Sequence, residues 1–308
     1  MAQVQSAKGA IVILPDDPYV TLDPRFAAFA VPGGRAEQLW TGGTWTEGPA
    51  WFADGYLIWS DIPSNRLLRW DESTATVTTF RQPSNGGNGN TVDRAGRLIT
   101  CEGSTRQVTR TETAGLITVL THRAEGLRFN APNDVVEKSD GSIWFTDPDY
   151  GGPDYQGARE MAGCHVWRLD PMTGALRQMT DDMAMPNGLA FSLDESTLFV
   201  TDTGSSHGAE FPNHIRRFSV GADSLTGGKV FATSAAKSFD GIRFDSTGNL
   251  WCGEADGVHC YAPDGALIGR IALPERAANL CFGGAGGHWL LITATTSLYR
   301  VPVNARAA

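Results

Sequence analysis

Basic residues are in short supply in this sequence. Its 308 residues include 25 Lys and Arg against 34 Asp and Glu, which gives a formal net charge of −9 and a sequence pI of about 5.1. Most of the affinity of proteins for nucleic acids comes from neutralising phosphates with Lys and Arg, so the composition argues against a nucleic-acid partner. The same deficit argues against binding to an anionic membrane.

Long apolar runs and cysteine motifs are missing as well. Near the N-terminus only residues 10–14 form an apolar run, and Pro15 ends it. We therefore expect no secretory signal, no membrane span and a soluble, cytoplasmic protein. The five cysteines contain no CxxC pair, and the six histidines show no HxH, HxxxH or HExxH spacing. Both facts argue against a disulfide framework and against a zinc site rich in His or Cys.

Glycine, by contrast, is abundant, with 36 residues, and it introduces a repeated phrase. In this phrase a turn leads into an apolar strand, then to small polar residues, then to a strand with basic or aromatic side chains. Six copies recur about every 40–55 residues, a period typical of propeller blades with four antiparallel strands. The first strands of the copies lie at residues 55–61, 96–102, 141–147, 196–202, 248–254 and 287–293.

These repeats predict an all-β protein, a single six-bladed β-propeller over residues 40–308. Residues 1–39 are predicted to form an N-terminal arm that can supply a closing strand. A sandwich of two sheets is the main alternative, but it does not require the same phrase six times. Trp59, Trp144 and Trp251 hold similar places in three copies, so we expect them to pack between blades rather than to bind a ligand.

Four short polar segments precede the repeated strands at matching places. Each offers one carboxylate or amide side chain, and these are Glu47, Asn133, Asn187 and Asp240. The blades of a propeller surround a central channel, where side chains from separate blades can converge. Oxygen donors of this kind suit Ca²⁺ or Mg²⁺ and can also hold Mn²⁺, Fe(II) or Zn²⁺. Taken singly, the segments also resemble ordinary turn sequences.

Longer stretches of the chain carry a resemblance to a known family. They are residues 88–91, 97–102, 128–134, 141–148 and 186–192. Together they resemble the SMP-30/gluconolactonase/luciferin-regenerating-enzyme family of metal-dependent six-bladed propellers, and most closely its gluconolactonase-type branch. The resemblance covers nearly the whole chain. It implies that Glu47, Asn187 and Asp240 ligate one divalent cation. It also implies that Asn133 contacts the substrate and can complete the metal shell, and that Asp240 is the acid or base.

The resemblance also points to further substrate contacts and to two departures from the family pattern. The further candidates are Asn90, Glu102, Arg128 and Tyr150, and for Tyr150 a packed aromatic ring is an equal alternative. Ala131 stands where some sugar-lactonase relatives have Arg, two residues before the substrate-contacting asparagine. Gly103 follows Glu102 where gluconolactonase-type relatives often have His. Both departures bear on which lactone is preferred.

The function implied by the resemblance is a metal-dependent lactonase, a hydrolase acting on carboxylic ester bonds. Such an enzyme opens sugar (aldono-) lactones such as gluconolactone to the aldonic acid. The cation would polarise the lactone carbonyl, and Asp240 would move the proton of the attacking water. Water activated by the cation alone is the alternative. Two other readings are a propeller esterase or phosphotriesterase acting on non-sugar substrates and a non-enzymatic propeller scaffold. The metal, the preferred lactone and the oligomeric state stay open.

Overall fold

The computed structural model describes residues 11–150, 158–206, 208–236 and 238–308. Regular structure in these ranges consists of β-strands and of short 3-10 helices, namely η1 (Pro24–Ala28), η2 (Gly204–Ser206) and η3 (Ala285–Gly287). Within them no helix has the length and apolar character that a membrane span requires. The chain divides into two compact units, residues 85–242 and residues 1–84 together with 243–308.

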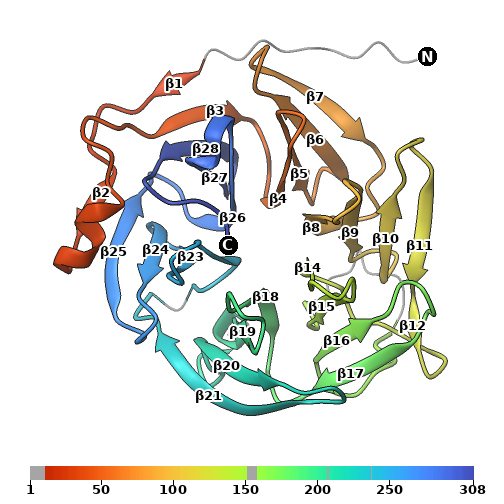
Figure 1. Ribbon diagram of the computed structural model, residues 1–308. Helices are drawn as coiled ribbons and strands as arrows, with labels where there is room; N and C mark the ends of the chain where they lie inside the picture. The colour runs from red at the N-terminus through yellow and green to blue at the C-terminus, as the bar shows by residue number, and fades with distance from the viewer. Residues whose placement is uncertain (1–10, 151–157, 207, 237) are drawn as a thin grey trace. The chain divides into compact units, whose positions relative to one another are not determined.

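The unit of residues 85–242 contains three antiparallel sheets of four strands, and in each sheet the strands follow one another in chain order (Figure 1). Their strands are β8 (Gly87–Val92), β9 (Leu98–Glu102), β10 (Gln107–Thr111) and β11 (Ile117–Thr121), then β14 (Val135–Glu137), β15 (Ile143–Asp147), β16 (His165–Leu169) and β17 (Leu176–Thr180), then β18 (Pro186–Phe191), β19 (Thr197–Asp202), β20 (His214–Val220) and β21 (Leu225–Thr233). A small hairpin, β12 (Arg123–Ala124) and β13 (Leu127–Arg128), connects the first two sheets along the chain.

The other unit also has three sheets, and residues near the N-terminus add strands to two of them. The sheets contain β4 (Thr46–Phe52), β5 (Tyr56–Asp61), β6 (Arg66–Asp71) and β7 (Thr76–Arg81), then β22 (Ile242–Phe244), β23 (Leu250–Glu254), β24 (Gly257–Tyr261) and β25 (Leu267–Ala272) with β2 (Tyr19–Thr21), then β26 (Ala277–Gly283), β27 (Trp289–Ala294) and β28 (Ser297–Pro302) with β3 (Glu37–Thr41) and β1 (Val12–Ile13). Strand β3 pairs with β28 and crosses the predicted boundary at residue 40. The division into an arm and a propeller stays a prediction.

The repeated phrases form the second strand of each sheet, β5, β9, β15, β19, β23 and β27. In five copies a glycine in the preceding turn has a positive φ, and these are Gly55, Gly96, Gly141, Gly248 and Gly287 with φ of 86°, 77°, 82°, 87° and 73°. Glycine adopts this left-handed conformation without the steric cost that a Cβ brings. The turn before β19 lacks this glycine, and there Glu195 has a φ of 55°. The glycines of the repeat are thus explained by turn geometry.

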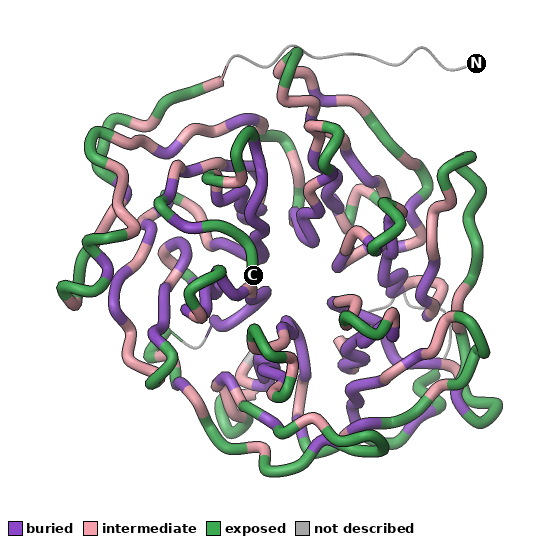
Figure 2. Tube along the Cα trace, viewed as in Figure 1, coloured by how far each residue is buried: buried purple, intermediate pink, exposed green. Residues whose placement is uncertain are grey.

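The repeated tryptophans lie in the cores between sheets, as predicted. Trp59, Trp144 and Trp251 are at most 1% exposed. Trp59 belongs to a core cluster that it shares with residues of β27 and β28. Trp144 shares a cluster with Leu189 of β18, and Trp251 meets Phe282 of β26 edge to face with ring centroids 6.1 Å apart. Figure 2 shows the resulting contrast between buried second strands and outer strands such as β11 and β21, which expose most of their residues.

Candidate metal and catalytic site

The predicted ligands lie where the first strand of a sheet begins. Glu47 is in β4 and Asn187 is in β18, whereas Asn133 and Asp240 come just before β14 and β22. In β4 the pairing with the second strand shifts register directly after Glu47, and in β18 it shifts between Pro186 and Leu189, a step that includes Asn187. A β-bulge of this kind bends the strand and re-aims the side chains beside it. In β4 and β18 the bulge therefore lies between the polar residues at the start of the strand and the apolar residues that follow.

Buried carboxylates at the end of the second strands hold the segments that lead to these positions. Asp147 accepts hydrogen bonds from the backbone N–H groups of residues 130 and 131 at 3.0 and 2.8 Å. Asp202 accepts from those of residues 184 and 185, both at 2.9 Å. Burial raises the pKa of Asp147 to about 7, although these N–H donors act in the opposite direction. The repeated phrase ends in Asp or Glu in five of its six copies, a signal that identifies such carboxylates in the sequence.

Two threonines join the main chains of the three predicted residues in the unit of residues 85–242. The backbone of Thr146 exchanges hydrogen bonds with residues 133–134 at 2.9 and 3.0 Å, and its Oγ1 donates to the carbonyl oxygen of Asn187 at 2.7 Å. The Oγ1 of Thr201 donates to the carbonyl oxygen of Asp240 at 2.9 Å. The structure therefore brings the backbones of these three residues together across neighbouring strands.

Gly188 lies at a close approach between these strands. A Cβ at this position would lie 2.5 Å from the carbonyl oxygen of Asp240 and 2.8 Å from the Cα of Gly241. Because both are main-chain atoms, the neighbouring strand would have to move. We expect Gly188→Ala to lower the free energy of unfolding by roughly 1–3 kcal/mol, measured by urea denaturation. Gly141→Ala is the comparison variant. Its added Cβ meets nothing within 4 Å, so this variant shows the effect of a strained φ without a steric clash. Wild-type stability of Gly188→Ala would contradict the close approach.

The side-chain amide of Asn187 is held by two hydroxyl groups. Asn187 is 7% exposed, and its Nδ2 donates to the hydroxyl of Tyr150 at 3.0 Å and to the Oγ1 of Thr203 at 3.4 Å. The two hydroxyls are also hydrogen-bonded to each other. Burial raises the pKa of Tyr150, and the charge of Asp240 raises it further. Tyr150, predicted as a substrate contact, is thus placed against a predicted metal ligand, and Thr203 was missed by the sequence analysis.

In the other unit, Glu47 is held by an asparagine that the sequence analysis also missed. Glu47 is 5% exposed, and its Oε2 accepts from the N–H of Gly48 at 2.9 Å and from the Nδ2 of Asn279 at 3.1 Å. The Oδ1 of Asn279 accepts from the N–H of Leu280 at 2.8 Å, which fixes the orientation of its amide. Asn279 lies in β26, the first strand of its sheet. The same register in the sixth repeat is the signal that could have identified it.

Three of the other predicted substrate contacts form hydrogen bonds within the unit of residues 85–242. Asn90 is fully buried, and its Oδ1 accepts from Thr100 at 2.7 Å. Glu102 is also fully buried, and its two oxygens accept from four side chains, those of Asn85, Thr105, Gln107 and Thr109. Arg128 lies in β13, and its backbone N–H donates to the Oε2 of Glu160 at 2.8 Å. The donors to Glu102 belong to its own sheet and to the turns next to it. Substrate contact by these three residues stays a prediction.

The donor chemistry of the three predicted ligands fits a hard divalent cation. Glu47, Asn187 and Asp240 offer carboxylate and amide oxygens, the donors that Ca²⁺, Mg²⁺ and Mn²⁺ prefer. Because the Nδ2 of Asn187 faces two hydroxyls, its Oδ1 lies at the opposite side of the amide. Nowhere in the described part of the chain do three or more His, Cys, Asp or Glu side chains lie close enough together to hold a metal ion. A cation at this site would therefore need an amide oxygen in addition to carboxylates.

Residues 204–208 read Gly-Ser-Ser-His-Gly and so match the Gly-x-Ser-x-Gly pattern of serine hydrolases. In those enzymes the serine lies on a sharp turn between a strand and a helix of an α/β sheet. Here residues 204–206 form the 3-10 helix η2 after β19, in an antiparallel sheet, and residue 207 lies outside the described residues. The structural context of a nucleophile elbow is therefore missing from the described segment.

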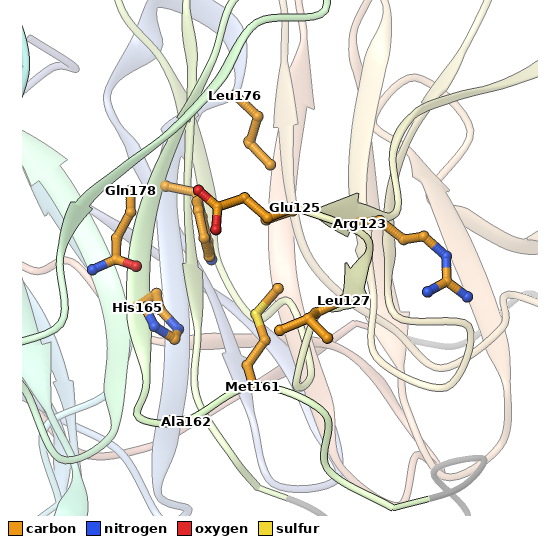
Figure 3. Close-up of a pocket in the computed structure, with 10 residues that line it drawn as sticks. Arg123, Glu125, Leu127, Met161, Ala162, His165, Leu176 and Gln178 are labelled. Carbon is orange, nitrogen blue, oxygen red and sulfur yellow. The ribbon is translucent and has the colours of Figure 1, made fainter.

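A pocket of about 300 Å³ lies on other strands of the unit of residues 85–242 (Figure 3). Its lining includes Arg123 and Leu127 of the β12–β13 hairpin, His165 of β16, and Leu176 and Gln178 of β17. None of the predicted site residues lines it. This pocket is therefore lined by residues other than the predicted metal ligands and substrate contacts.

Comparison with solved structures defines the class of fold. The structure of a gluconolactonase from Xanthomonas campestris matches 98% of this chain and all of its own chain, with a TM-score of 0.89 and 34% sequence identity. Together with the six sheets, this match confirms the fold class predicted from the repeats, an all-β protein that is a six-bladed β-propeller.

Comparison with known sequences then defines the family. A family profile described as "SMP-30/Gluconolactonase/LRE-like region" matches residues 45–296, so the chain belongs to this family. A gluconolactonase of Zymomonas mobilis is 30% identical over 83% of this chain and 78% of that protein. A pentonolactonase of Haloferax volcanii is 28% identical over 80% of this chain and 80% of that protein.

Proposed function

We propose that this protein is a metal-dependent lactonase, a hydrolase that opens sugar (aldono-) lactones such as gluconolactone to the corresponding acid. Its membership of the family and its similarity to a gluconolactonase and a pentonolactonase support the reaction. The observation that carries the metal dependence is local. Asp240 is a carboxylate that is 3% exposed. The Oγ1 of Thr201 donates to the carbonyl oxygen of Asp240 and accepts from the N–H of the residue after Asn187, so it connects the two main chains. The amide nitrogen of Asn187 donates to two hydroxyls.

In this proposal Glu47, Asn187 and Asp240 hold one divalent cation, with Ca²⁺, Mg²⁺ or Mn²⁺ favoured by the oxygen donors and Zn²⁺ or Fe(II) as alternatives. When bound, the cation would polarise the lactone carbonyl and stabilise the charge that develops on its oxygen. Asn133 would orient the lactone through its amide. Asp240 would take a proton from the attacking water and return it to the ring oxygen as the bond between that oxygen and the carbonyl carbon breaks.

The proposed partners are small-molecule lactones, and the proposed location is the cytoplasm. All five cysteines are buried thiols in the described residues and form no disulfide there. Burial raises the pKa of Cys101, Cys260 and Cys281, so these thiols are held in the unreactive protonated form. Reduced, buried cysteines are typical of proteins in a reducing compartment.

Hydrolysis by metal-free protein, reconstituted with one cation at a time, tests the proposed function. The substrates are gluconolactone, a pentonolactone, 4-nitrophenyl acetate and a phosphotriester, and the cations are Ca²⁺, Mg²⁺, Mn²⁺, Zn²⁺ and Fe(II). We expect lactone opening above the spontaneous rate with at least one cation and none without it. Failure with every cation would overturn the proposal. Faster turnover of the aryl ester or the phosphotriester would favour an esterase or phosphotriesterase instead.

A further inference from the structure

We propose that Tyr150 and Thr203 are positioning residues whose hydroxyls determine which end of the Asn187 amide faces the cation. The inference rests on the proposed function, because it concerns the cation assigned there. It gives Tyr150 a role other than the predicted substrate contact. It also assigns a role to Thr203, which is otherwise an ordinary residue directly after a β-strand.

The hydrogen bonds form a chain whose direction is set at one end. The Nδ2 of Asn187 donates to Tyr150, Tyr150 and Thr203 share a hydrogen bond, and the Oγ1 of Thr203 donates to the carbonyl oxygen of Met185 at 3.4 Å. Each hydroxyl has one proton, and a carbonyl can only accept. When Thr203 gives its proton to Met185, Tyr150 must give its own to Thr203. The amide must then present an N–H group to Tyr150.

The acceptor at the end of the chain is itself held in place. The carbonyl oxygen of Met185 also accepts from the backbone N–H of Thr203 at 3.0 Å. The backbone N–H of Met185 donates to the buried carboxylate of Asp202 at 2.9 Å. Both sides of this residue are therefore anchored to the end of β19. The carbonyl cannot readily turn away and release the direction of the chain.

An asparagine ligand needs such a device, whereas an aspartate does not. A carboxamide has one acceptor end and one donor end, and only its oxygen can ligate a cation. Without a fixed partner for its nitrogen, Asn187 could turn its NH₂ group toward the ion. Since Asn187 is 7% exposed, bulk water does not simply replace the lost hydroxyls. Contacts that orient a ligand in this way typically contribute 10–100-fold to metal affinity.

The experiment is a cation titration of metal-free protein by isothermal calorimetry, with Ca²⁺, Mg²⁺, Mn²⁺ and Zn²⁺ tested alone and the tightest one used for the variants. We expect Tyr150→Phe and Thr203→Val each to weaken binding by roughly 10–100-fold. In an Asn187→Asp background either carboxylate oxygen can face the cation. There Tyr150→Phe should change the affinity by less than about threefold. A hydroxyl with a merely structural role would instead cause the same loss of affinity in both backgrounds.

Tyr299→Phe is the matched control, because it removes another buried tyrosine hydroxyl, one that donates to Glu275 at 2.6 Å. It should leave cation affinity unchanged. If Tyr150→Phe does not fold, as judged by urea denaturation without metal, Thr203→Val provides the same comparison. Equal losses in the wild-type and Asn187→Asp backgrounds, or no loss in either, would overturn the inference alone. Wild-type protein that binds none of the four cations would overturn the proposed metal site and the inference with it.

Discussion

Asp240→Asn is expected to lower the kcat of lactone opening by roughly 10²–10⁴, the loss typical of a positioned general base. Asparagine keeps an oxygen that can face the cation, but it cannot accept the proton of the attacking water. The Thr201 bond to the carbonyl oxygen of residue 240 does not involve the side chain, so the backbone position should be kept. The measurement combines the cation content of the variant with hydrolysis rates at several cation concentrations, corrected for spontaneous opening of the lactone.

Asn187→Ala separates ligation from proton transfer. This variant loses a ligand and keeps the base, so its main defect should be weaker cation binding, and excess cation should restore part of the activity. Asp240→Asn saturated with cation should not recover. If it nevertheless turns over at nearly the wild-type rate, Asp240 is only a ligand, and water activated by the cation reacts without help from this carboxylate.

The architecture could be predicted because its determinants are local. The turn before the second strand of a sheet requires a positive φ at one residue, and glycine marks this turn in five copies of the repeat. The fully buried Trp144 and Trp251 lie three residues after the turn glycine and Trp59 lies four residues after its own, and each packs toward a neighbouring sheet. Because features of this kind recur from one unit of a repeat fold to the next, six similar phrases were enough to predict six sheets.

The candidate site could be predicted only in part, because its supporting contacts join distant segments. Asn187 and Asp240 stand out by their position in the repeat. Asn279 holds the place of Glu47 in the sixth repeat, but it is 232 residues away in the chain, and the repeat does not show that the two side chains are hydrogen-bonded. Thr203 is one of many threonines at the end of a strand, and its role appears only when the loop after β15 brings Tyr150 to the same amide. A repeat reveals equivalent positions, but not the partners that each position finds in three dimensions.

Glu47→Gln is expected to weaken cation binding by roughly 10²-fold or more, the loss typical of removing one member of a buried charge pair. The reason goes beyond the lost charge. The N–H groups of Gly48 and Asn279 both donate to Oε2, so glutamine must put its oxygen at that place and its NH₂ group where the other carboxylate oxygen was. An N–H group would then face the cation. Calorimetric titration of Glu47→Gln, with urea denaturation as a check on folding, measures the loss.

The partner Asn279 makes this argument testable by rescue. In the double variant Glu47→Gln/Asn279→Asp, residue 279 offers a carboxylate oxygen in place of the NH₂ donor, so the glutamine NH₂ can donate to it and its oxygen can turn toward the cation. The backbone N–H of Gly48 loses its acceptor in this orientation, which opposes the turn. The oxygen of residue 279 that accepts from Leu280 is retained in this exchange. We therefore expect the double variant to bind the cation more tightly than Glu47→Gln alone, by at most about tenfold, because the N–H of Gly48 still favours an oxygen at its side. An affinity no higher than that of Glu47→Gln would contradict the orientation argument, and wild-type affinity in Glu47→Gln would remove Glu47 from the ligand set.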